Sequence, residues 1–177
     1  MMKSISLIRS IKVSRGILLG LIMHAVAVSA APVSEGDFAP TFNVKTLEGP
    51  SVTTENLPLE KPVYLKFWAT WCTFCVEEMP HTQQIYNTYG DKVEVIAVDV
   101  GMNDSLSKIN AFLKANDYSL PVNFDADGQL TSQFGVLGTP QHILIGRNGK
   151  VLHRSALITD DLEDKIQSAI AQINIRD

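Results

Sequence analysis

Apolar and polar positions along the chain form short continuous apolar runs, separated by longer stretches with helical spacing. Two runs rich in β-branched and aromatic side chains, Val63–Trp68 and Val93–Val100, predict buried strands. Between them, residues 72–89 have the length and apolar spacing of a helix. A second helix is expected to begin at Ser105, because a serine there precedes an apolar stripe that starts at Leu106.

Shorter elements flank this central part. Gly49-Pro50 divides two strand-like segments within residues 42–54 and predicts a hairpin, and Asn148-Gly149 fits a tight turn of type I′. A last helix is expected over Asp160–Ile173, where apolar residues recur on one side. The other short elements are strands over Pro121–Phe124, Gln141–Ile145 and Val151–Ser155, and a helix over Gln129–Phe134.

The order of these elements indicates the fold class. Strands and helices alternate at first, and a strand pair followed by a helix closes the chain. This order is typical of a mixed sheet that is covered on both faces. We therefore predict a single α/β domain with a mixed central sheet, flanked by helices and preceded by a β-hairpin.

Composition and charge narrow the class of protein. With 45% hydrophobic and 19% charged residues among 177, the chain resembles soluble globular proteins rather than disordered or fibrous ones. Residues 1–30 contain four cations and no acid, which leaves 11 basic and 19 acidic side chains in the remainder. A domain with this excess of acidic residues gives no support for a nucleic-acid partner, because binding a nucleic acid requires a basic face.

The first thirty residues have the pattern of an export signal. A basic segment precedes the apolar run Gly16–Ala27, and Val28-Ser29-Ala30 offers small residues with the spacing of a cleavage site. The alternative is an uncleaved membrane anchor, but the run is about 15 residues long, whereas a spanning helix needs about 20. We expect a signal peptide over 1–30 and one domain over 31–177, exported to the periplasm or an equivalent compartment without stable membrane insertion.

The only two cysteines, Cys72 and Cys75, stand three positions apart where a predicted strand gives way to a helix. The backbone N–H groups at a helix start stabilise a thiolate and lower the pKa of a cysteine there. A thiolate attacks disulfides and gives a mixed disulfide, which a second thiol resolves. The spacing therefore favours redox chemistry, with Cys72 as nucleophile and Cys75 as resolving thiol.

A cysteine pair can also bind a metal ion or form a purely structural disulfide. A zinc site would need a second Cys or His pair at ligand spacing, but the chain has no third cysteine, and His81, His142 and His153 are dispersed. A structural disulfide that encloses two residues would restrain little of the chain. We therefore expect no metal site here.

At this point the residues show a family resemblance. The segment Val63–Pro80, VYLKFWATWCTFCVEEMP, resembles the active-site segment of the thioredoxin superfamily, and in detail that of the exported TlpA/ResA-like thiol–disulfide oxidoreductases. The similarity includes FWATWC, the C-x-x-C pair, Glu78 and a proline in the helix. It extends to Gly138-Thr139-Pro140 and covers roughly residues 35–175. The resemblance implies a thioredoxin-like fold.

The resemblance also implies a place for clients to bind. Pro140 matches the cis-proline of the family, which faces the dithiol, and cis bonds are readily tolerated only before proline. Thr139 would then offer its backbone N–H and C=O to an extended client segment, in strand-like pairing. Trp71 is expected to form an exposed apolar rim beside the nucleophile, whereas Trp68 is expected in the core.

Two charged residues are candidates for tuning the dithiol. Glu78 matches the acidic residue that the family keeps near its cysteines, where it would exchange a proton with the thiols or raise their pKa. Lys66 occupies the position at which thioredoxins proper have a buried aspartate. An ammonium group there would favour the thiolate if it approaches the sulfurs. The alternatives are a solvated Glu78 and a Lys66 whose stem carries its charge out to water.

The leading functional hypothesis is an exported, monomeric thiol–disulfide oxidoreductase that reduces disulfides in client proteins. No G-x-G-x-x-G motif for a nicotinamide or flavin is present, so we expect no cofactor, and electrons from a membrane thiol donor. The alternative is a module that holds Cu(I) with Cys72, Cys75 and His142. A peroxidase is less favoured, because Thr70 and its neighbours lack the Pro-x₃-Thr-x₂-Cys pattern.

Overall fold

A computed structural model describes residues 31–49 and 51–172. The expected signal peptide, Pro50 and the expected end of the last helix at Ile173 lie outside these ranges. The elements in chain order are β1 (Asn43–Lys45), β2 (Ser51–Thr53), β3 (Val63–Trp68), α1 (Thr73–Tyr89), β4 (Glu94–Asp99), α2 (Leu106–Ala115), β5 (Val122–Phe124), α3 (Gln129–Gln133), β6 (Gln141–Ile145), β7 (Val151–Ser155) and α4 (Leu162–Ala171).

The central sheet is mixed, as the element order predicts. Its strand order is β5-β4-β3-β6-β7, with β3, β4 and β5 parallel and with β6 and β7 antiparallel to their neighbours. The carboxyl ends of β3, β4 and β5 therefore lie at one edge of the sheet. The segment that carries the cysteines and the loop between β4 and α2 both begin at this edge.

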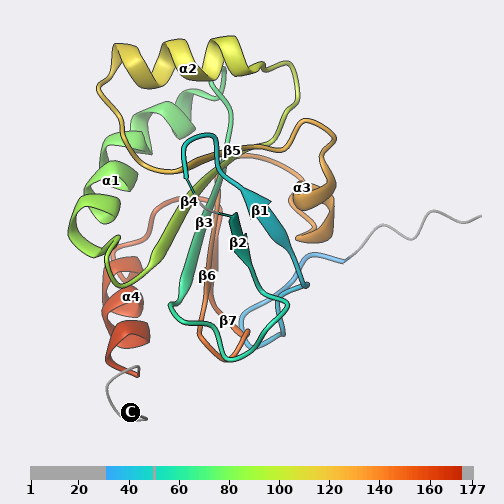
Figure 1. Cartoon of the computed structure of the whole chain (residues 1–177), viewed down its shortest axis with the longest axis vertical. Helices are drawn as coiled ribbons and strands as arrows, with labels where there is room; N and C mark the ends of the chain where they lie inside the picture. Colours follow the sequence, from blue (N-terminus) through green and yellow to red (C-terminus); the bar gives the residue numbers. More distant parts are fainter. Residues whose placement is uncertain (1–30, 50, 173–177) are drawn as a thin grey trace, which may run out of the picture.

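Side chains of β3 alternate between two cores. Val63, Leu65 and Phe67 pack with the hairpin β1–β2 and with α3 on one face of the sheet. Tyr64 and Trp68 point to the opposite face, where α1, α2 and α4 supply the covering residues. Figure 1 shows α1 and α4 along one side of the sheet and the hairpin across the other. All six residues of β3 are buried, which explains why the strand is apolar at every position except Lys66.

Two local expectations from the sequence are wrong. Leu106 does not pack under α2, because it is 47% exposed and the helix buries Ile109 instead. The turn at Asn148-Gly149 is not of type I′, since only Gly149 of the pair has a positive φ, of 78°. The Gly149 N–H donates to the Gly146 carbonyl at 2.9 Å, so a three-residue loop ends in a left-handed glycine.

Within the described ranges, no helix is long and apolar enough to cross a membrane.

Candidate active site

The two cysteines lie at the junction of β3 and α1. Cys72 is the N-cap of α1, with extended backbone (φ −85°, ψ 105°), and Cys75 follows in the first helical turn. Their sulfurs are joined in a disulfide with an S–S distance of 2.12 Å. The Cys72 sulfur accepts the backbone N–H of Cys75 at 3.3 Å. It occupies the place of a capping oxygen, where free helix N–H groups stabilise negative charge.

The first turn of α1 contains no acidic side chain that would compete for these N–H groups. The two cysteines differ in exposure, since Cys72 as a residue is 7% exposed and Cys75 is fully buried. An attacking thiolate must reach its partner, whereas a resolving thiol needs to reach only the other cysteine. This difference in exposure bears on which of the two cysteines attacks and which resolves.

A proline loop lies at the same end of the sheet. The Thr139–Pro140 peptide is cis, as the resemblance implies. Gln141, the next residue, pairs with Phe67 near the end of β3, so the loop adjoins the segment that leads to Cys72. Pro140 is buried, and Thr139 is partly exposed.

Apolar side chains remain exposed around this end of the sheet. Trp71 is 51% exposed, and its indole N–H donates to the Met102 carbonyl at 2.6 Å. Phe74, between the cysteines, is 63% exposed. It shares a mainly apolar hollow of about 540 Å³ with Leu137, Thr139, Pro140 and Leu157. Trp68, by contrast, is fully buried, as expected.

Lys66 and Glu78 meet next to the backbone of Cys75. The Lys66 side chain is fully buried, and its Nζ donates to the Cys75 carbonyl at 3.3 Å and to Glu78 Oε2 at 3.4 Å. The alternative in which Lys66 reaches out to water is therefore wrong for this structure. Glu78 is not fully solvated either, because its side chain is 16% exposed and its Oε1 accepts the Ile158 N–H at 2.8 Å.

Burial and pairing shift both pKa values. Burial lowers the pKa of Lys66 to about 8, although the Glu78 carboxylate opposes this shift. Burial raises the pKa of Glu78, but the hydrogen bonds from His142 and Ile158, with the charge of Lys66, outweigh it and lower that pKa to about 2. At neutral pH the two residues therefore form a buried ion pair next to Cys75.

His142, considered from the sequence only as a possible metal ligand, completes this cluster. His142 is fully buried, pairs with Lys66 across β3 and β6, and has Nε2 3.0 Å from Glu78 Oε2 and Nδ1 2.7 Å from the Tyr64 hydroxyl. A carboxylate only accepts, so Nε2 carries the proton and Tyr64 donates to Nδ1. The signal that would have found His142 is the antiparallel pairing of its strand with that of Lys66.

These contacts disfavour the copper alternative. Both ring nitrogens of His142 are occupied by Tyr64 and Glu78, so the third ligand considered for Cu(I) is already engaged. Among residues 31–49 and 51–172, no group of three or more His, Cys, Asp or Glu side chains is arranged to hold a metal ion.

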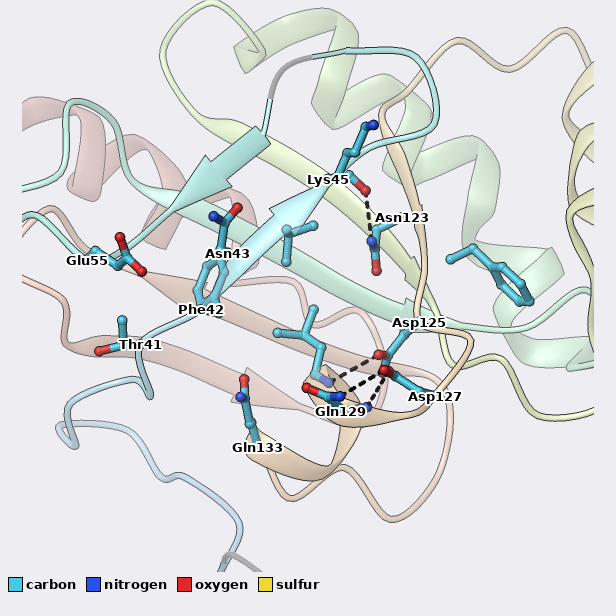
Figure 2. A pocket seen from close by; sticks show the side chains of 13 residues that line it. Thr41, Phe42, Asn43, Lys45, Glu55, Asn123, Asp125, Asp127, Gln129 and Gln133 are labelled. Atoms are coloured by element: carbon cyan, nitrogen blue, oxygen red, sulfur yellow. Dashed lines mark hydrogen bonds between the residues drawn. The ribbon is translucent and has the colours of Figure 1, made fainter.

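A second hollow, of about 440 Å³, lies between the hairpin and the β5–α3 connection (Figure 2). Its most engaged side chain is Asp125, which accepts the N–H groups of Leu130 and Thr131 and the Thr131 hydroxyl. Asn123 donates to the Lys45 carbonyl at the same hollow. These polar groups hold the start of α3 and the hairpin in place, so the hollow has a structural explanation.

The fold and this site define a class of protein. A mixed sheet with helices on both faces, a C-x-x-C pair at the start of α1 and a cis-proline before β6 are the features of a thioredoxin-like protein.

Comparison with known proteins supports the assignment to this class. Residues 36–154 match the AhpC/TSA family. The thiol-disulfide oxidoreductase ResA of Bacillus thuringiensis subsp. konkukian is 38% identical over 118 residues, which cover 66% of each chain. ResA of Bacillus subtilis is 33% identical over 152 residues, covering 81% of this chain and 83% of that protein. The structure of a candidate thiol:disulfide interchange protein DsbE from Chlorobium tepidum, 32% identical, gives a TM-score of 0.67 over 78% of this chain and 99% of that one.

The chain therefore belongs to the AhpC/TSA family and, within it, to the thioredoxin-like thiol–disulfide oxidoreductases related to ResA. The predicted fold and reaction class are confirmed.

Proposed function

We propose that this thiol–disulfide oxidoreductase works as a reductase of disulfides in exported client proteins. The observation that carries the proposal is the position of Cys72, whose sulfur caps α1 and which is the more exposed of the two cysteines. A thiolate is stabilised at this position without a neighbouring acid in the first helical turn.

The proposed reaction transfers two electrons in two exchange steps. The Cys72 thiolate attacks one sulfur of a client disulfide, forms a mixed disulfide and releases the other client sulfur as a thiolate. Cys75, once deprotonated, attacks the Cys72 sulfur, releases the second client thiolate and forms the Cys72–Cys75 disulfide. An external dithiol then reduces the enzyme, and we assign this role to a membrane thiol donor.

We propose that the protonation of the buried Cys75 thiol is controlled by Lys66, Glu78 and His142. Cys75 has no exposed surface, and the Lys66 ammonium reaches its carbonyl group. Lys66 would stabilise thiolate charge near this site, and Glu78 would pass protons between the buried cluster and solvent. His142 would hold the Glu78 carboxylate toward Lys66 through its Nε2–H.

Client binding is assigned to the surface around the dithiol. The partly exposed Thr139 would pair through its backbone with an extended client strand. Trp71 on one side and the hollow lined by Phe74 on the other would contact apolar client side chains. Apolar surface of this kind, exposed beside a reactive group, is typical of an interaction site.

Residues 1–30 are proposed to be a cleaved signal peptide, and residues 31–177 to form the exported domain, as a monomer. The basic start and the apolar run support this assignment, and the periplasm or an equivalent oxidising compartment follows from it. Retention of the segment as an anchor is the less favoured alternative, because the apolar run is shorter than the roughly 20 residues that span a bilayer.

The test is to express a Cys75→Ser variant in the native compartment and to trap clients as mixed disulfides, with Cys72→Ser as the matched control. We expect covalent adducts with Cys75→Ser and none with the control. Alkylation of the wild-type protein should show a mostly reduced pair. A mostly oxidised pair that cells cannot reduce would contradict the direction, and an absence of adducts would contradict the function.

A further inference from the structure

Beneath the turn that leads to the dithiol lies a buried acid that the proposed reaction does not use. Asp99 ends β4, and its side chain has no exposed surface. Its Oδ1 accepts the Gly101 N–H at 2.9 Å, whereas Oδ2 has no donor among the residues that the structure describes. A buried carboxyl oxygen without a donor destabilises the folded state, so the group that lies next to Asp99 has to be identified.

That neighbour is a second acid, Asp104, in the loop between β4 and α2. The carboxyl groups of Asp99 and Asp104 interact, and each shifts the pKa of the other. Two carboxylates only accept, so the contact becomes a hydrogen bond when one of the two carries a proton. Asp104 accepts other bonds, from Thr70 N and the Thr70 hydroxyl at 2.8 and 2.9 Å and from Ser105 N at 3.1 Å. The proton therefore belongs on Asp99.

Asp104 in turn holds the segment that presents the nucleophile. Thr70 stands two residues before Cys72, and both its backbone N–H and its hydroxyl are bound to the Asp104 carboxylate. The next residue, Trp71, donates its indole N–H to Met102, in the same loop. The loop after β4 thus fastens both residues that immediately precede Cys72.

We propose that Asp99 and Asp104 are positioning residues for the dithiol: while they share one proton they hold the Thr70–Trp71 turn, and loss of that proton releases it. The inference rests on the dithiol function proposed above and adds to it a pH-dependent control over how the Cys72 sulfur is presented. Neither acid touches the reacting atoms. They act through Thr70.

The groups around Asp99 set the pH at which it loses its proton close to neutral. Burial raises the pKa of Asp99 to about 7; the Gly101 N–H opposes the rise, and the carboxyl groups of Asp104 and Asp125 add to it. Burial also acts to raise the pKa of Asp104, but its bonds from Thr70 outweigh this and lower it. Above neutrality both acids are therefore charged and repel each other. Asp125 is held by the N–H groups of α3, whereas Asp104 lies in the loop after β4, so the repulsion acts on the bonds that Asp104 makes to Thr70.

The two tryptophans provide a readout that does not depend on activity. Trp68 is the register partner of Asp99 in neighbouring parallel strands, and Trp71 belongs to the turn that Asp104 holds. The chain has no other tryptophan. Emission of the oxidised protein would be recorded between about pH 5.5 and 9, because the disulfide keeps the cysteines from titrating. The variants are Asp99→Asn and Asp104→Asn, with the exposed Asp91→Asn as control.

The wild type and Asp91→Asn are expected to show a transition with a midpoint near pH 7, below the pKa of about 8 of Lys66. Asp99→Asn should lose it and keep the acid form of the spectrum, because the amide still accepts from Gly101 and donates to Asp104. Asp104→Asn should move the midpoint down by at least about one pH unit, since a like charge is removed. A wild type without a transition near pH 7, or a transition near pH 7 that persists in Asp99→Asn, overturns the proposal.

A second measurement covers the case in which a variant does not fold. The ¹³C chemical shift of the Asp99 carboxyl carbon, followed in the oxidised wild type, should titrate near pH 7. A midpoint below about pH 5 would contradict the shared proton. These readouts use no client protein. A failed reductase assay together with an intact transition would therefore reject the function proposed above without contradicting the role of Asp99 and Asp104.

Discussion

Replacement of Glu78 by glutamine tests the buried ion pair with a defined magnitude. The pKa of Glu78 falls from 4.5 to about 2 in the folded protein, with hydrogen bonds from His142 and Ile158 as the cause that overcomes burial. A lowered carboxyl pKa stabilises the folded state above the unfolded value, and this stability is lost as the pH falls through the folded value. The shift of about 2.5 units corresponds to about 3 kcal/mol at neutral pH.

Glu78→Gln keeps the shape of the side chain and the bond from Ile158, but it removes the charge that balances Lys66. We expect the variant to be less stable than wild type by about 3 kcal/mol at pH 7, since a buried ammonium is left without its partner. Near pH 2 the difference should shrink to below about 1 kcal/mol, because wild-type Glu78 is then about half protonated in the folded state.

The assay is urea denaturation of the oxidised proteins at a series of pH values, followed by circular dichroism. Glu77→Gln is the matched control, since Glu77 is the exposed neighbour on the same helix. Only the difference between variant and wild type is used, which removes the titration of other acids. A Glu78→Gln variant as stable as Glu77→Gln at neutral pH would refute the ion-pair reasoning.

Three further changes have expected outcomes. Lys66→Ala should raise the pKa of the Cys72 thiol, because a positive charge near the dithiol is lost; an unchanged pH profile of alkylation relative to Lys92→Ala would contradict this. Tyr64→Phe should lower stability by about 1–2 kcal/mol in denaturant titrations, since His142 Nδ1 loses its donor. Gly149→Ala should lower the melting temperature, at a cost of about 1 kcal/mol or more, because φ is 78° and the new Cβ would lie 2.9 Å from Leu57.

Much of the fold follows from local patterns. The run Val63–Trp68 is a buried strand because both faces of the sheet are covered, and Ser105 caps α2 with its hydroxyl, as its position suggests. The predictions fail where long-range packing decides. Leu106 fits the apolar stripe of α2, yet the helix turns only Ile109 fully into the core. Periodicity does not determine which edge of a stripe meets the sheet.

The candidate site was likewise predictable where local sequence patterns define it and not where tertiary contacts do. The cysteine pair and the proline loop are recognisable because their chemistry requires fixed spacing. Lys66 and Glu78 were candidates, but their contact depends on how α1 lies across β3. His142 joins them through strand pairing, and Asp99 and Asp104 act through Thr70, 34 positions from Asp104. Such partners are brought together only by the tertiary fold.

The most direct test of the central claim is to identify which sulfur attacks. The reduced Cys75→Ser and Cys72→Ser variants would each be exposed to a disulfide-bonded client peptide near neutral pH and analysed by intact-mass and peptide mass spectrometry. We predict a stable mixed disulfide on Cys72 in the first variant and little adduct on Cys75 in the second, because Cys75 is fully buried. Equal or faster reaction of Cys75 would contradict the assignment of Cys72 as the nucleophile.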